Sequence, residues 1–148
     1  MVMNEAVRLK EFCEGADRLV CYGAGDYACM ATAYAKTEGI SFDAYCVSGE
    51  PKQDALFGAP LRKIDADIAE GAHFVVAAEE RHHDAIESTL ASHGVKREDI
   101  FFVNSELYVY LREQTSVCSK AFIQAICEHR GDDDVPVDED LADSVSKY

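Results

Sequence analysis

Two patterns are missing from this sequence, and their absence limits what the chain can be. Its six cysteines include no C-x-x-C pair and no metal-ligand rhythm, so we expect buried thiols in a reducing cytoplasm and no bound metal. No apolar run approaches the roughly 18 residues that span a bilayer, and residues 1–10 lack the apolar segment of a signal peptide. We therefore expect a soluble cytoplasmic protein with no membrane partner.

Basic residues are also scarce. The 14 lysines and arginines face 28 aspartates and glutamates, and the formal net charge is −14. Nucleic-acid phosphates need a basic face, so a nucleic-acid partner is excluded. Part of the acidic excess lies in residues 131–148, which contain few large apolar side chains. We expect this segment to be an acidic, disordered tail.

Familiar catalytic motifs are absent as well. The sequence has no G-x-S-x-G elbow, no P-loop lysine and no Tyr-x-x-x-Lys pair; Tyr34 is followed by Ala35 and Lys36. No cysteine has an activating partner nearby in sequence. An enzymatic role would need a catalyst built from residues distant in sequence. Its most reasonable form would be oxidation or reduction of a nucleotide-sugar, and the catalytic residues stay unknown.

What is present is a glycine-containing turn between an apolar run and a helical segment. Arg18 to Ala28 has the pattern G-x-G-x-x-A, with the glycines at Gly23 and Gly25. Gly23 gives the backbone freedom for a tight turn, Gly25 lets a ligand phosphate approach the main chain, and Ala28 lets the helix pack closely. This pattern is typical of the opening of a nucleotide-binding βαβ unit.

Strand-like and helix-like segments alternate along the rest of the chain. Residues 74–78 form a continuous apolar run, which is typical of a strand covered on both faces. The other expected strands lie at 42–47, 58–61 and 100–103, and the expected helices at 4–14, 27–38, 65–70 and 80–93. The alternation predicts an α/β fold over residues 1–104, a three-layer Rossmann-like open parallel sheet with right-handed crossovers.

A C-terminal helical extension follows Asn104. Residues 105–113 and 120–129 each place apolar side chains close together. We expect residues 105–130 to cover part of the sheet or to contact a second subunit in a homodimer. If the domain is a non-catalytic interaction or oligomerisation module, the residues expected at a subunit contact are Tyr108, Leu111, Phe122 and Ile126.

The order of several segments is familiar. The run Leu19 to Tyr27, then Val47-Ser48, Leu56 to Leu61 and Val75 to Ala77, resembles the small Rossmann-like domains that accompany sugar-modifying enzymes. Similar domains form the N-terminal part of nucleotide-sugar acyltransferases and of some dehydrogenase-like sugar proteins, and occur attached to glycosyltransferases and methyltransferases. The resemblance covers Arg18 to Val103. It implies a Rossmann-like fold and binding of NAD or a nucleotide-sugar, without the catalytic domains of those families.

The candidate site lies where the predicted parallel strands end. The residues expected there are Gly23, Ala24, Gly25 and Asp26 at the phosphate end, Ser48 and Glu50 on the ribose side, and Ala78, Glu79 and Arg81 on the opposite wall. Two features favour the alternative that this turn binds no ligand. The Asp26 carboxylate can cap the same N–H groups that a phosphate would use. An NAD site usually has an acid at the end of its second strand, where this chain has Ser48.

Other uses of these residues rank lower. Methyl transfer from S-adenosylmethionine favours an acid and a third glycine where this chain has Cys21 and Tyr27. Tyr22 and Tyr27 are expected to pack at the rim more than to stack on a ligand. The adjacent His82 and His83 point about 100° apart on a helix, so they do not converge on a metal.

Basic side chains near the site are expected to be solvated. Lys52 and Arg62 could supply charge for a ligand phosphate, but a surface role is favoured for both. Two functions therefore stay open. The first is binding of a nucleotide-type ligand linked to sugar metabolism. The alternative is a non-catalytic interaction or oligomerisation module with a degenerate nucleotide site.

Overall fold

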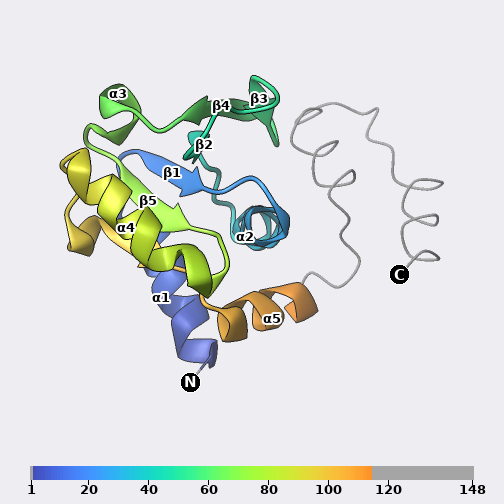
Figure 1. Ribbon diagram of the computed structural model, residues 1–148. Helices are drawn as coiled ribbons and strands as arrows, with labels where there is room; N and C mark the ends of the chain where they lie inside the picture. The colour runs from blue at the N-terminus through green and yellow to red at the C-terminus, as the bar shows by residue number, and fades with distance from the viewer. Residues whose placement is uncertain (1, 115–148) are drawn as a thin grey trace.

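The computed structural model describes residues 2–114, which form a mixed α/β fold (Figure 1). The elements in chain order are α1 (Val2–Glu14), β1 (Leu19–Tyr22), α2 (Asp26–Thr37), β2 (Ala44–Val47), β3 (Ala55–Leu56), β4 (Ala59–Lys63), α3 (Ala66–Ala69), β5 (His73–Val76), η1 (Glu80–His82), α4 (His83–Ser92), η2 (Arg97–Asp99), β6 (Ile100–Phe102) and α5 (Ser105–Gln114). The expected helix at 120–129 and the expected tail at 131–148 lie outside the described residues.

The described strands form one six-stranded sheet in the order β3-β4-β2-β1-β5-β6. The sheet is parallel except for the antiparallel pairing of β3 with β4. In the middle strand, Cys21 pairs with Tyr45 of β2 on one side and with Val75 of β5 on the other. The predicted α/β fold is confirmed, but the sheet is mostly parallel instead of wholly parallel, because β3 pairs with β4 in the antiparallel sense.

Helices cover the sheet on both faces. Successive residues of β1 belong alternately to two hydrophobic clusters, with Leu19 and Cys21 in one and Val20 and Tyr22 in the other. The first cluster contains buried residues of α1, α2 and α5, and the second contains buried residues of α3 and α4. Because Phe74, Val75 and Val76 in β5 are fully buried, the expectation of a strand covered on both faces is confirmed.

The β3–β4 hairpin differs from the sequence prediction, which had one extended segment at 58–61. Strand β4 begins at Ala59 and continues to Lys63, and β3 precedes it. The turn between them consists of Phe57 and Gly58, whose φ angles are 51° and 79°. Both angles lie in the left-handed region that a two-residue hairpin turn of this kind requires. Phenylalanine rarely adopts such angles, so the Phe57-Gly58 dipeptide gave no hairpin signal.

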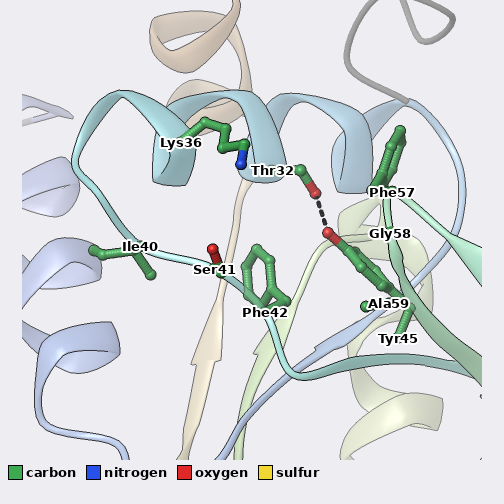
Figure 2. Close-up of a pocket in the computed structure, with 9 residues that line it drawn as sticks. All are labelled: Thr32, Lys36, Ile40, Ser41, Phe42, Tyr45, Phe57, Gly58 and Ala59. Atoms are coloured by element: carbon green, nitrogen blue, oxygen red, sulfur yellow. Dashed lines mark hydrogen bonds between the residues drawn. The ribbon is translucent and has the colours of Figure 1, made fainter. Parts of the chain in front are cut away.

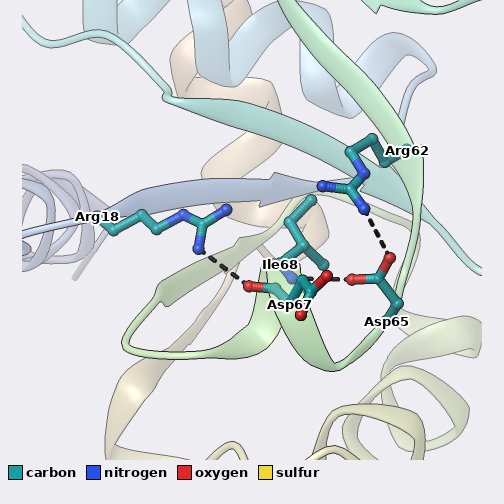
Figure 3. Close-up of polar contacts among 5 residues, drawn as sticks. All are labelled: Arg18, Arg62, Asp65, Asp67 and Ile68. Carbon is teal, nitrogen blue, oxygen red and sulfur yellow. Dashed lines mark hydrogen bonds and ion pairs between the residues drawn. The ribbon is translucent and has the colours of Figure 1, made fainter.

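The β4–β5 connection is held by side chains of charged residues (Figure 3). Asp65 caps helix α3, since its carboxylate accepts from the Ile68 N–H at 2.8 Å. The Arg62 guanidinium lies 2.8 Å from the other Asp65 oxygen, so the surface role expected for Arg62 is confirmed. Arg18 donates to the Asp67 carbonyl at 3.0 Å and so ties the start of β1 to α3.

Helix α5 packs on the same domain, which is one of the two alternatives predicted for residues 105–113. It contacts α1 and α2, and Leu107 and Leu111 are fully buried. The assignment of Leu111 to a subunit contact was therefore wrong, because its side chain belongs to the core. The sequence pattern indicates that α5 has an apolar face, but it does not indicate which residues pack against that face. Among the described helices, none combines the length and apolar character needed to cross a membrane.

Candidate functional site

The predicted site residues lie at the carboxyl edge of the parallel sheet. Strand β1 leads to Gly23, β2 leads to Ser48, and β5 leads to Ala78. The strand order reverses between β1 and β5, since the chain moves outward through β2 on one side and through β6 on the other. Ligands of open α/β sheets bind in the crevice outside the strand ends at such a reversal.

Gly23 is required by the contact between β1 and the end of β5. Its φ is +135°, and a Cβ at this position would lie 2.4 Å from the Ala77 carbonyl oxygen. Its N–H donates to the Cys46 carbonyl at 2.8 Å. The expected need for backbone freedom at Gly23 is confirmed, and its cause is the close approach of another strand.

Gly25 and Asp26 form the N-terminus of α2. Gly25 is the N-cap residue and makes no side-chain cap, and a Cβ there would have no atom within 4 Å. Asp26 is exposed, and among the described residues no hydrogen bond joins its carboxylate to the N–H groups of the first turn. The expected competition from Asp26 as a cap is therefore not seen.

The ribose side contains a hydrogen bond between two hydroxyl groups. The Tyr22 hydroxyl lies 2.5 Å from the Ser48 Oγ. Burial raises the pKa of Tyr22, and the hydrogen bond to Ser48 partly opposes that rise. Glu50 is highly exposed, and its carboxylate lies 3.7 Å from the Lys63 ammonium. Ser48 thus sits directly after β2, as predicted, whereas Glu50 pairs with a residue of β4.

The opposite wall contains Ala78, Glu79 and Arg81. The Arg81 guanidinium lies 3.2 Å from the Glu79 carboxylate, and both side chains are exposed. The Ala78 carbonyl accepts from the His83 Nε2 at 2.8 Å. Arg81 is therefore engaged by its own loop, and His83 contacts the main chain.

Sequence reasoning did not find the contact between this wall and α5. The Glu80 carboxylate accepts from the Ser105 N–H at 2.8 Å and from the Ser105 hydroxyl at 2.6 Å. These bonds lower the pKa of Glu80. The Asn104 side chain accepts from the Leu107 N–H at 2.8 Å. Asn104-Ser105 before an apolar run is a readable helix start, but no local signal indicates the distant Glu80.

Tyr27 is used within the fold. Its ring stacks on Tyr108 of α5, with centroids 4.1 Å apart and planes 4° from parallel. Burial raises the pKa of Tyr27, and Glu79 adds to the rise. The preference for rim packing of Tyr27 is confirmed, and the contact joins α5 to the first turn of α2.

The side chains at this edge of the sheet limit its chemistry. Asp26, Glu79 and Glu80 are exposed there. Burial raises the pKa of the Cys21 and Cys46 thiols, which belong to β1 and β2. Nowhere in residues 2–114 do three or more His, Cys, Asp or Glu side chains gather closely enough to hold a metal ion. The polar groups at this edge therefore include main-chain N–H groups and the hydroxyl groups of Tyr22 and Ser48.

Comparison with known proteins gives no match to a family model, to a curated protein or to a solved structure.

Proposed function

We propose that this chain is a three-layer Rossmann-like domain that binds a nucleotide-type ligand at the carboxyl edge of its sheet. Counted in chain order without β3, its parallel strands lie in the order 3-2-1-4-5. Dinucleotide-binding domains share this order, and they bind the pyrophosphate at the first strand-to-helix turn. In this chain that turn is Gly23 to Asp26.

The observation that carries the proposal is the uncapped N-terminus of α2 at the strand-order reversal. Gly25 leaves open space beside the first N–H groups of the helix, and no side chain caps them. Such groups, together with the positive end of the helix dipole, favour a phosphate.

The ligand class follows from the groups around this turn. A ribose beside the end of β2 would meet Ser48 and the Tyr22 hydroxyl, which already form a hydrogen-bonded pair. Lys63 and Arg81 pair with Glu50 and Glu79. NAD or a nucleotide-sugar is the ligand that we propose for this turn. The proposed ligand links the chain to sugar metabolism.

A matched pair of glycine substitutions tests the site. Gly25→Ala adds a methyl group to the space beside the α2 N-terminus, and Gly15→Ala adds one at the other end of β1, where its Cβ would make only ordinary contacts. We expect NAD or a UDP-sugar to raise the melting temperature of the native chain and of Gly15→Ala, and the shift to be lost in Gly25→Ala. No shift with any of these ligands at saturating concentration would refute the proposal.

A second candidate function is a non-catalytic interaction module. Several polar side chains of the crevice are already engaged: Tyr22 with Ser48, and Arg81 with Glu79. This function predicts no nucleotide shift and a stable homodimer in solution, with contacts made by residues after Leu111. Light scattering at micromolar concentration tests it, and a monomeric mass would count against it.

A further inference from the structure

Helix α5 begins at the same edge of the sheet as the candidate site. It follows β6, so its first residue, Ser105, lies near the carboxyl ends of the parallel strands. In Figure 1, α5 passes beside α2 and close to the connection between β5 and α4. The two walls of the crevice, at the N-terminus of α2 and after β5, therefore both lie beside this helix.

The core holds α5 in place. Leu107 and Leu111 are fully buried, and the helix packs on both α1 and α2. Its start is capped, because the Asn104 side chain accepts from the Leu107 N–H at 2.8 Å. Burial of two leucine side chains on one face anchors a helix of this length to the domain. Helix α5 can therefore serve as a fixed point for neighbouring segments.

The wall after β5 is less firmly packed. The short helix η1 contains no buried residue, and connections with few buried apolar contacts open locally at a low cost in free energy. The Glu80 carboxylate attaches this wall to α5, since it accepts from the Ser105 N–H at 2.8 Å and from the Ser105 hydroxyl at 2.6 Å. Hydrogen bonds to a charged acceptor are stronger than those between neutral groups.

The first turn of α2 is attached to the same helix. Gly25 and Asp26 are exposed, but the next residue, Tyr27, stacks on Tyr108 with ring centroids 4.1 Å apart and planes 4° from parallel. Aromatic pairs contribute more than the burial of their area alone. Helix α5 thus contacts one wall through Glu80 and the other through Tyr27.

The middle of α2 is fixed by a separate contact with the sheet (Figure 2). The Thr32 Oγ1 lies 2.6 Å from the Tyr45 hydroxyl, and both side chains are buried. The cavity beside this bond measures about 20 Å³, which is room for about one water molecule. The parts of the site that are left to adjust are the first turn of α2 and the connection after β5.

We propose that Ser105 and Tyr108 are positioning residues for the candidate site. Ser105 holds the connection after β5 through Glu80, and Tyr108 holds the first turn of α2 through Tyr27. Helix α5 thereby sets the separation of the two walls between which a ligand phosphate lies. The effect on ligand affinity rests on the proposed function, whereas the positioning of the walls does not.

Hydrogen exchange of the full chain without ligand tests the positioning. We expect Ser105→Ala to accelerate exchange of the His82 N–H in the wall after β5, and Tyr108→Leu to accelerate exchange of the Cys29 N–H in the first turn of α2. Both amides donate to main-chain carbonyls, at 2.9 and 3.0 Å. Each acceleration should be at least roughly fivefold. Native rates at these amides in both variants would overturn the proposal.

Matched variants control for a general loss of stability. Ser92→Ala removes a hydroxyl group that donates to the Thr89 carbonyl at 2.6 Å, at the end of α4. Tyr110→Leu makes the same change as Tyr108→Leu at a half-buried position of α5. Both controls should leave the His82 and Cys29 amides at their native rates. Ser105→Thr keeps the hydroxyl group and should restore native exchange.

The Kd of NAD or UDP-glucose, measured by calorimetry where every variant is folded, tests the effect on the ligand. Ser105→Ala and Tyr108→Leu should raise the Kd at least roughly fivefold, while Ser105→Thr and the two controls bind as the native chain does. A lower melting temperature with an unchanged Kd would show a merely structural role and overturn the proposal. If the native chain binds neither ligand, the proposed function fails, and the exchange pattern alone decides the positioning.

Discussion

The substitution Gly23→Ala tests the packing of the sheet at the candidate site. The new Cβ would lie 2.4 Å from the Ala77 carbonyl oxygen, at a backbone with φ +135°. Backbone strain of this kind costs about 1–3 kcal/mol. Moving a main-chain carbonyl in a packed core adds an overpacking cost of about 1–3 kcal/mol. We therefore expect Gly23→Ala to lower the free energy of unfolding by roughly 2–6 kcal/mol.

Urea denaturation of the full chain measures this loss. With a urea m-value of about 2 kcal/mol/M, a loss of about 4 kcal/mol lowers the midpoint by about 2 M. Gly25→Ala is the control, because its φ is −104° and its Cβ would meet no atom within 4 Å. Its stability should stay within about 1 kcal/mol of the native value. If both variants unfolded at the same urea concentration, the close contact between Gly23 and Ala77 would be refuted.

Two further substitutions test α5 and its attachment. Leu107→Ala removes a fully buried side chain and should lower the free energy of unfolding, measured in urea, by about 2–5 kcal/mol. Val109→Ala, at a position that is 50% exposed, should lower it by less than about 0.5 kcal/mol. Similar losses in the two variants would contradict the packing of α5. The hydrogen bonds from Ser105 lower the pKa of Glu80 in the folded state. The contact therefore stabilises the fold at pH values above the pKa of Glu80 in the unfolded chain. This stabilisation is lost as the pH falls through the pKa of Glu80 in the folded state. Glu80→Gln should flatten that part of the pH dependence of the urea midpoint between about pH 7 and pH 3; an unchanged pH profile would exclude the contact.

The general α/β arrangement was predictable because it depends on local and repeated signals. The continuous apolar run beginning at Phe74 indicates a strand buried on both faces, and the glycines at 39 and 94 end helices where expected. Parallel pairing follows from alternation of strands with helices. The β3 strand was not predictable, because it is only two residues long and its turn uses a phenylalanine at positive φ.

The sequence predicted where the residues of the candidate site lie, but it did not predict which side chains they contact. Parallel strands necessarily bring the residues after β1, β2 and β5 to one edge, so Gly23 and Ser48 were found from their place in the pattern. The partners of exposed charges depend on loop geometry, and so Glu50 with Lys63 was missed. Leu111 shows the same limit for apolar faces: periodicity identifies the face, and only the tertiary fold shows what covers it.

The strand register has a consequence for how the chain folds. Leu56 pairs with Ala59 across the hairpin, whereas Leu19 must find His73 across more than a third of the chain. Hairpins form in about 1–10 μs, and pairings between distant residues follow more slowly because a long loop must close first. In pulsed hydrogen exchange during refolding, we expect the hairpin amides to become protected before those of β1. The central strand of the finished sheet would then be among the last to be assembled.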